Sequence, residues 1–353
     1  MHISEHRRKQ LKLIEWIRLG SFIGFLGFFI LILVGIDNLL LSFVLALVIN
    51  YLLGPIVNSL ERAGVHRLFS TVLVFSLGGI FVGFGITAIV PFLSSQFSNL
   101  QEQFPTYIGG VSRLITQLEL KIQDLTGVSY QTDFGLEAES VLLGWTKSLF
   151  TDLPGIVSQL GTTLLLSPFF AFFLIKDGRL FAKNFLSIVP NHIFELTLNM
   201  YYQINDQMGQ FVRARLLEAL IVALAVWVGL YAINFPFAGL LSLFAGVTNL
   251  IPYVGPLFGA IPAIIIALIN DSSTFTLVML CVVYGTAQLI DIFFIIPLVV
   301  AKLVNLHPIT VVVAMIVGAQ LLGILGMIIS IPVASVLKVT ITSVYQHLVE
   351  FRA

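Results

Sequence analysis

The segment that most constrains the fold of this chain covers residues 246–262 and reads GVTNLIPYVGPLFGAIP. Three prolines and three glycines lie in a stretch that is otherwise apolar enough for a bilayer. Proline breaks a helix, and lipid tolerates broken helix only where the backbone is buried in protein or lines a watery cavity. The segment therefore predicts discontinuous helix around a polar site at membrane depth, an arrangement that transporters use.

The composition predicts an all-α polytopic membrane protein. The chain has 353 residues, of which 58% are hydrophobic and 10% are charged, whereas soluble domains are about 25% charged. The formal net charge of zero gives no basis for a nucleic-acid partner. P-loop, GxSxG, HExxH and CxxC motifs are absent, and the six histidines are scattered. We therefore expect no enzyme activity, no cofactor and no metal site.

Eight hydrophobic segments organise the chain. Six are long enough for a full crossing, which takes about 20 apolar residues: Leu19–Ile36, Leu39–Val57, Leu68–Pro91, Pro154–Ile175, Leu216–Phe235 and Phe275–Val300. The other two, 238–269 and 308–337, are interrupted by proline and glycine. Their halves are too short to cross, so we expect two broken or re-entrant helical hairpins.

The basic residues predict the orientation. With the N-terminus in the cytoplasm and six crossings, only Arg113, Lys121 and Lys147 of the 18 lysines and arginines lie outside, as the positive-inside rule requires. Both termini are then cytoplasmic. The predicted segments are N-terminal spans (1–91), an external amphipathic helical segment (92–153), a fourth span (154–175), a cytoplasmic helical linker (176–213) and a C-terminal core with both hairpins (214–353).

Polar residues inside spans are candidates for a transport site, because ionisable groups are costly there. Asp291 and Gln288 share one face of a predicted span and could carry a solute or ion. Alternatively, Asp291 pairs with Lys302 or with a hairpin amide and only stabilises packing, or it lies at the headgroup boundary. Thr248 and Asn249 flank the broken segment, and Gln320 is the corresponding polar residue of the second hairpin. The glycines and prolines expected to shape or gate the hairpins are Pro252, Gly255, Pro256, Gly259, Pro262, Pro297, Gly323, Gly326 and Pro332.

Three charged residues cluster at the predicted cytoplasmic entry of the fifth span: Arg213, Arg215 and Glu218. Arg215 and Glu218 are three residues apart and can pair on a helix. Arginines at such a boundary commonly reach the headgroup region along their apolar stems. We therefore interpret the arginines as interface residues, and the alternative is that the three residues form the cytoplasmic entry of a transport path.

Several of these motifs resemble the autoinducer-2 exporter family of bacterial membrane proteins. The matching stretches are ALVINYLLGPIVNSLERAGVHR at 46–67, FFLIKDG at 172–178, FVRARLLEALI at 211–221 and, most specifically, NLIPYVGPLFGAIP at 249–262. Gln288, Asp291 and Pro297 have the family's glutamine–acid–proline spacing, and LHP follows at 306–308. The chain departs from the pattern at Arg215, Glu218 and the apolar residues 292–294.

The resemblance implies a multi-pass exporter of the bacterial inner membrane, which lies in the lipid bilayer and forms a homo-oligomer, such as a cyclic pentamer. The implied activity is secondary efflux of a small polar solute such as autoinducer-2, a quorum-sensing signal, driven by an ion gradient. A sodium or lithium/proton antiporter with the same residues is an alternative. A third is a membrane scaffold that transports nothing and whose outer helices bind a partner.

Overall fold

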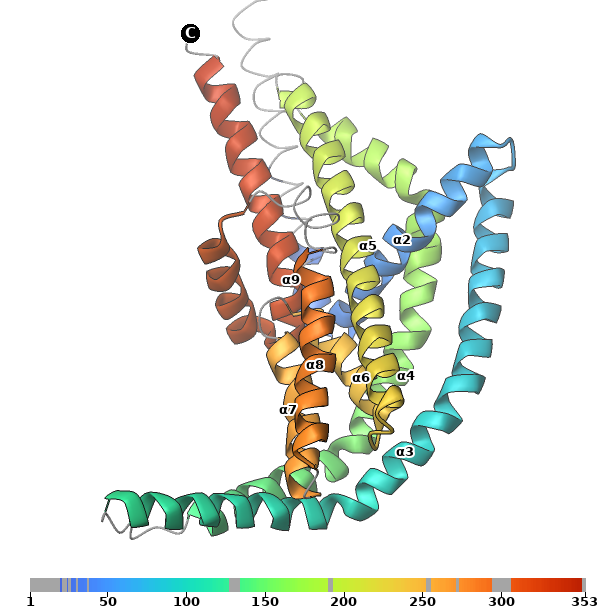
Figure 1. The fold of residues 1–353 in the computed structure, drawn as a ribbon. Coiled ribbons are helices and arrows are strands. Elements are labelled where there is room, and N and C mark those ends of the chain that lie inside the picture. The colour runs from blue at the N-terminus through green and yellow to red at the C-terminus, as the bar shows by residue number, and fades with distance from the viewer. Residues whose placement is uncertain are drawn as a thin grey trace, which may run out of the picture. The chain divides into compact units, whose positions relative to one another are not determined.

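A computed structural model describes residues 20, 24, 27–29, 31–36, 38–126, 134–189, 193–251, 255–270, 273–293 and 306–350 (Figure 1). Every regular element in these ranges is a helix. The labelled helices are α2 (Leu39–Arg62), α3 (Arg67–Thr126), α4 (Phe134–Ile188), α5 (Phe194–Ala232), α6 (Ala238–Thr248), α7 (Gly255–Ile269), α8 (Thr274–Ile290) and α9 (Pro308–Glu350). The structure is therefore the expected all-α fold.

The chain forms two compact units, each assembled from segments far apart in the sequence. Unit 1 contains residues 1–79, 158–213 and 303–353, and unit 2 contains residues 80–157 and 214–302. The two hairpins fall in different units. Helices α3, α4 and α5 each run without interruption from one unit into the other.

Apolar surface covers much of the described chain. Within the residues that the structure describes, four helical stretches are long and apolar enough to cross a membrane, namely Leu39–Arg62, Arg67–Thr126, Thr274–Phe293 and Gly326–Ser343. Many large apolar side chains on them are exposed, including Phe81 at 79% and Phe84 at 74%. Exposed apolar patches of this extent mark an interaction surface, and lipid is the one that fits helices of this length.

The first hairpin is broken where the sequence predicts. Helix α6 ends at Thr248, and α7 begins at Gly255. Pro256 lies in the first turn of α7. Backbone N–H groups in a first turn have no acceptor within the helix, so a proline there removes no helical hydrogen bond. Pro262 lies inside α7, and Pro252 and Pro297 lie outside the described residues.

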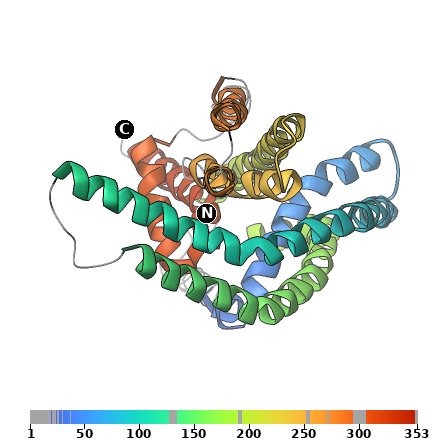
Figure 2. The same cartoon turned by 60° about the horizontal axis from the view of Figure 1, so that its bottom comes forward.

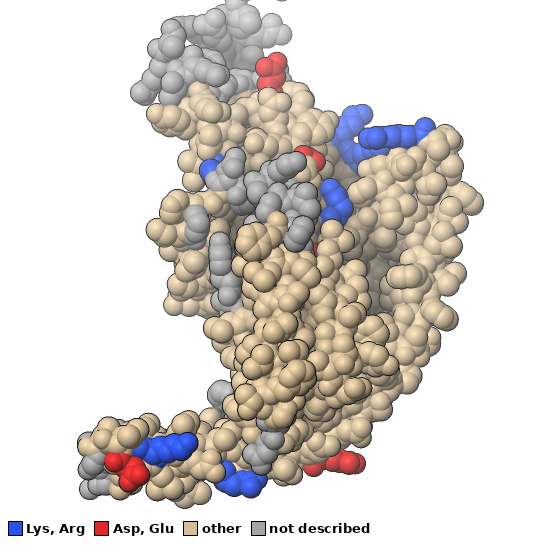
Figure 3. All heavy atoms as spheres, viewed as in Figure 1, with Lys and Arg blue, Asp and Glu red and all other residues tan. Residues whose placement is uncertain are grey.

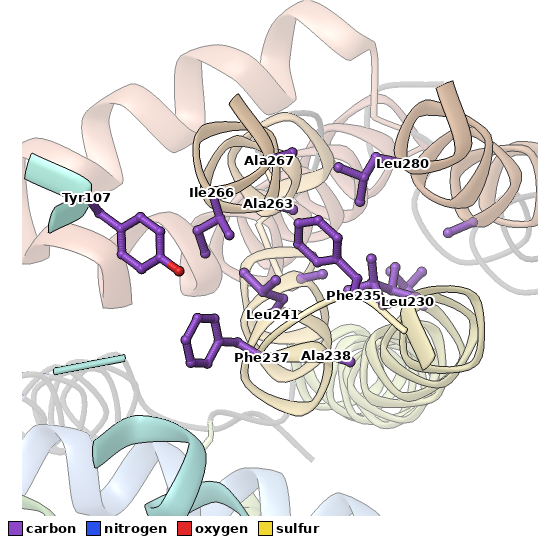
Figure 4. Close-up of a cluster of buried hydrophobic side chains, with 14 residues drawn as sticks. Tyr107, Leu230, Phe235, Phe237, Ala238, Leu241, Ala263, Ile266, Ala267 and Leu280 are labelled. Atoms are coloured by element: carbon purple, nitrogen blue, oxygen red, sulfur yellow. The ribbon is translucent and has the colours of Figure 1, made fainter. Parts of the chain in front are cut away.

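Helix α7 packs against both α6 and α8, and the three helices surround the main core of unit 2. Its buried side chains come from the end of α5, the connection to α6, and α6, α7 and α8; Tyr107 of α3 joins them (Figure 4). Leu230, Ala263 and Ala267 are fully buried there. Ser273 begins α8 by accepting a hydrogen bond from the Thr276 N–H at 3.3 Å, which satisfies one of the unpaired donors of its first turn.

Glycines allow the hairpin backbones to approach closely. A Cβ atom added at Gly246 would lie 2.8 Å from the Ala219 carbonyl oxygen of α5. One added at Gly255 would lie 2.5 Å from the Thr248 carbonyl carbon and 2.6 Å from the Asn249 Cα. Real Cβ atoms do not approach backbone this closely, so α5, α6 and the start of α7 meet through glycine contacts.

The predicted external segment forms two adjacent helices. The end of α3 and the start of α4 lie side by side in both ribbon views (Figures 1 and 2), joined by hydrogen bonds from Ser112 to the Gly135 carbonyl and from the Phe134 N–H to Glu119. Charged side chains gather there, whereas the visible surface of α7 and α8 carries none (Figure 3).

This segment packs against the hairpin rather than standing apart from it. Tyr107 makes an edge contact with Phe237. The Gln96 side chain accepts a hydrogen bond from the Leu240 N–H in the first turn of α6 at 3.1 Å. A Cβ at Gly110 would collide with the side chain of Ile269 at the end of α7.

In unit 1, α9 is two helices joined at a sharp break. Leu322 and Gly323 have non-helical backbone angles, and Gly323 has a positive φ of 61° that favours glycine. The two arms touch at Gly318 and Gly326, where a Cβ on either residue would lie within 2.7 Å of the carbonyl carbon of the other. The hairpin is therefore broken at Gly323, whereas Pro332 lies within the second arm.

Candidate functional site

Two charged residues of α5 form a buried ion pair in unit 2. Arg215 Nη1 lies 2.7 Å from Glu218 Oε1 and 2.8 Å from Oε2. The Glu218 side chain is 3% exposed and that of Arg215 is 13% exposed. Their spacing of three residues places both on one face of the helix. Glu218 therefore lies inside the protein with its charge compensated by Arg215.

Asn249 joins this pair from the end of α6. Its side-chain Nδ2 donates to Glu218 Oε1 at 3.4 Å, and the residue is 3% exposed. Asn249 directly follows Thr248, the last residue of α6. The last backbone carbonyl groups of a helix have no hydrogen-bond partner within that helix. The broken hairpin thus brings an amide and a helix terminus to the buried carboxylate.

Asp291 completes the cluster from the end of α8. It is 4% exposed and follows Ile290, where the helix widens into a π-helical turn over residues 291–293. Turns of this kind are frequent at functional sites. The sequence places Asp291 in the middle of a span, whereas in the structure it lies where regular α-helix ends.

The carboxyl groups of Glu218 and Asp291 are close enough for the charge of one to act on the other. Asp291 Oδ1 is buried and has no hydrogen-bond partner among the described residues. Two negative charges in one buried site repel each other, which favours a state in which the two carboxyl groups hold one proton between them. The pair is therefore suited to hold and release a single proton.

The remaining candidates have other surroundings. The Thr248 hydroxyl bonds to the Phe244 and Ala245 carbonyls of its own helix. Gln288 is half-buried on α8, and Gln320 is exposed on the first arm of α9 in unit 1. Lys302, the alternative partner of Asp291, lies outside the described residues.

The predicted pairing of Arg215 with Glu218 is confirmed, and Arg215 is held in this buried ion pair instead of reaching toward an interface. Arg213 behaves differently, because it donates to the Tyr51 carbonyl at 3.0 Å and belongs to unit 1. The available signal in the sequence was the paired spacing of Arg215 and Glu218 within an apolar helix. The four residues come from α5, α6 and α8, so their meeting depends on tertiary structure.

Breaking the ion pair is expected to destabilise the fold strongly. Arg215→Met or Glu218→Leu alone leaves a buried charge uncompensated, which costs about 3–5 kcal/mol. The double variant removes both charges, so its melting temperature should exceed that of either single variant. Thermal unfolding in detergent, followed by tryptophan fluorescence, measures this.

An exposed ion pair provides the matched control. Arg179 pairs with Glu61 at 2.9 Å, and its side chain is 65% exposed. Arg179→Met should therefore cost at most about 1 kcal/mol. Simple addition of the Arg215 and Glu218 effects in the double variant would show that the two residues are energetically independent.

The arrangement is suited to binding a proton, an ion or a polar solute. One guanidinium, two carboxyl groups and one amide lie at a helix break in an apolar bundle. Among the described residues, no group of three or more His, Cys, Asp or Glu side chains could hold a metal ion. Ionisable groups buried at membrane depth in other proteins mark ion and substrate pathways.

Comparison with known proteins agrees with this description. The family model "AI-2E family transporter" matches residues 19–346. "Putative transport protein YrrI" of Bacillus subtilis (strain 168) is 26% identical over 86% of this chain and 86% of its own length. "AI-2 transport protein TqsA" of Escherichia coli (strain K12) is 22% identical over 90% of each. The family model covers nearly the whole chain, so the chain belongs to the AI-2E family of multi-pass membrane transporters.

Proposed function

We propose that the protein is a secondary transporter that exports a small polar solute at the expense of an ion gradient. The observation that carries this proposal is the buried cluster of Arg215, Glu218, Asn249 and Asp291 at the break of the first hairpin. Autoinducer-2 is the first solute to test, because the name of TqsA assigns that solute to a relative of similar length. The driving ion under this proposal is the proton.

The cluster offers a simple coupling scheme. Glu218 and Asp291 share one proton when the site is closed, which leaves one negative charge for Arg215 to compensate. Loss of that proton leaves two carboxylates beside one guanidinium, and the additional negative charge favours opening of the site to water, because an uncompensated buried charge is unfavourable. The hairpin is the element that would move, since Asn249 links it directly to Glu218.

A specific observation also favours a second candidate, sodium or lithium/proton antiport. Two carboxyl groups and the oxygen of an amide are the hard oxygen ligands that small alkali cations accept. In that case the cation and the proton compete for the same carboxylates. The proton would then be exchanged for a cation instead of accompanying a solute.

Flux in proteoliposomes separates the two candidates. Vesicles loaded with autoinducer-2 should lose it faster when a pH gradient is imposed, and a protonophore should abolish the difference. Under the antiport candidate, sodium or lithium addition would change the internal pH while autoinducer-2 stays inside. If neither flux exceeds that of empty liposomes, both candidates are wrong.

The location and assembly belong to the same proposal. We place the protein in the bacterial inner membrane with both termini in the cytoplasm, as a homo-oligomer for which a cyclic pentamer is the expected form. The distribution of lysine and arginine supports the orientation. Cross-linking in native membranes would measure the number of subunits.

We expect residues 92–153 outside the cell and residues 176–213 in the cytoplasm. In a Cys281→Ser background, a membrane-impermeant thiol reagent should label Ser129→Cys in intact cells and Ser187→Cys only after permeabilisation. Ser187 is exposed on α4, so protection of this site reports its side of the membrane; Ser129 lies outside the described residues. The reverse labelling pattern would invert the topology.

A further inference from the structure

A tyrosine hydroxyl on α8 lacks a hydrogen-bond partner in the described part of the chain. The oxygen of Tyr284 is buried and unpaired among the described residues, as is Oδ1 of Asp291. The ring of Tyr284 packs against the apolar core formed by α5, α6 and α7. Phenylalanine would make the same apolar contacts without leaving a donor unsatisfied. A buried polar group of this kind requires an explanation beyond packing.

The spacing along α8 connects this hydroxyl to the candidate site. Tyr284, Gln288 and Asp291 are separated by four and three residues, so they share one face of the helix. The helical rise places Tyr284 about 10 Å from Asp291 along the axis. Gln288 is half-buried between them. A phenol, an amide and a carboxyl group thus form a polar row on a helix that is otherwise apolar on that face.

The chemistry of the row indicates what it would bind. A phenol can donate one hydrogen bond, a carboxylate accepts, and an amide side chain does both. Solute hydroxyl groups donate and accept in the same way, and a neutral solute needs no further charge in the site. Helix α7 (Gly255–Ile269) and helix α8 (Thr274–Ile290) contain no Asp, Glu, Lys or Arg that would favour a charged solute.

We propose that Tyr284 is a further solute-binding residue, and that the row from Tyr284 to Asp291 recognises a small neutral solute with several hydroxyl groups. This inference rests on the proposed function, because it adds a specificity-determining contact to the same site. The unpaired hydroxyl of the closed site receives its partner when solute enters along α8. Asp291 exchanges the proton, and Tyr284 selects the solute.

Tyr284→Phe tests this inference in reconstituted full-length protein. With autoinducer-2 as the probe, and erythritol as a second hydroxylated solute, the KM for export should rise about tenfold, the factor expected for one lost hydrogen bond to a bound solute. The dependence of flux on the pH gradient should remain. The melting temperature should stay equal or rise, because the substitution removes an unsatisfied donor.

Tyr231→Phe is the matched control. Tyr231 lies on α5, is 69% exposed and stacks on Trp227, so this variant should behave as wild type. An unchanged KM in Tyr284→Phe, or a melting temperature several degrees lower, would overturn the inference, since the hydroxyl would then be idle or structural. Loss of gradient dependence with an unchanged KM would assign Tyr284 to proton transfer and contradict it equally.

The proposed function fails in a distinguishable way. If Glu218→Gln transports autoinducer-2 with wild-type gradient dependence, the cluster does not couple transport to the proton gradient. The row from Tyr284 to Asp291 then does not belong to a coupled transport site. If that variant loses coupling while Tyr284→Phe has the wild-type KM for both probes, only the inference about Tyr284 is wrong.

Discussion

Asp291→Asn is expected to reduce gradient-driven flux to the level of empty liposomes while the protein still folds. The amide is nearly isosteric with the carboxyl group and removes a buried ionisable group, which is costly in a membrane. Folding and membrane insertion should therefore be preserved. An amide does not titrate, so it cannot accept the proton that Glu218 and Asp291 share in the proposed scheme.

The measurement is flux against an imposed pH gradient, with a protonophore as reference. Asp291→Glu should retain part of the coupling, because its carboxyl group still titrates but is displaced by one methylene group. Glu102→Gln, which changes an exposed acid in the predicted external segment, is the matched control and should behave as wild type. Wild-type gradient dependence in Asp291→Asn would reduce Asp291 to a packing residue.

A second large effect is expected at Gly255. A Cβ atom at this position would lie 2.6 Å from the Asn249 Cα and closer still to the Thr248 carbonyl group. Both neighbours are backbone and cannot rotate away, so even Gly255→Ala must separate α6 from α7. Overpacking of this kind costs about 1–3 kcal/mol, and Gly255→Val should cost more.

Because Asn249 contacts Glu218, the displacement should also disrupt the candidate site. Gly255→Val is therefore expected to abolish transport while the protein still inserts into the membrane, which fractionation and flux assays measure separately. Gly285→Val is the matched control, because no atom lies within 4 Å of a Cβ added at that exposed position of α8. Wild-type flux in Gly255→Val would remove the reason to treat the break as the moving element.

The second hairpin shows how far the sequence could specify a break. Glycines and a proline marked residues 308–337 as discontinuous, and α9 does break there. The sequence could not distinguish Gly323, where the chain turns, from Pro332, which the second arm accommodates within a helix. That difference depends on the contact between Gly318 and Gly326, which holds the two arms together across the break.

The candidate site divides in a similar way. Asp291 and Asn249 are recognisable in the sequence, because each is a polar residue in an apolar or broken segment. Arg215 was interpreted as an interface residue, because a sequence does not reveal whether a charge near a helix end faces lipid headgroups or protein. Tyr284 has no signal of its own, since an aromatic residue in an apolar span is ordinary until its hydroxyl is found unpaired.

By itself, the sequence determined that the protein is helical, that it lies in a membrane, and where its first hairpin breaks. These properties follow from local composition. The length of an apolar segment decides whether it can span a membrane, and proline and glycine affect the helix only within a few residues of their own positions. Only the tertiary structure decided that Arg215, Glu218, Asn249 and Asp291 meet. The four residues belong to three helices. The two that are farthest apart in the sequence, Arg215 and Asp291, are separated by 76 positions. Their proximity depends on the glycine contacts that bring the backbones of α5, α6 and α7 together.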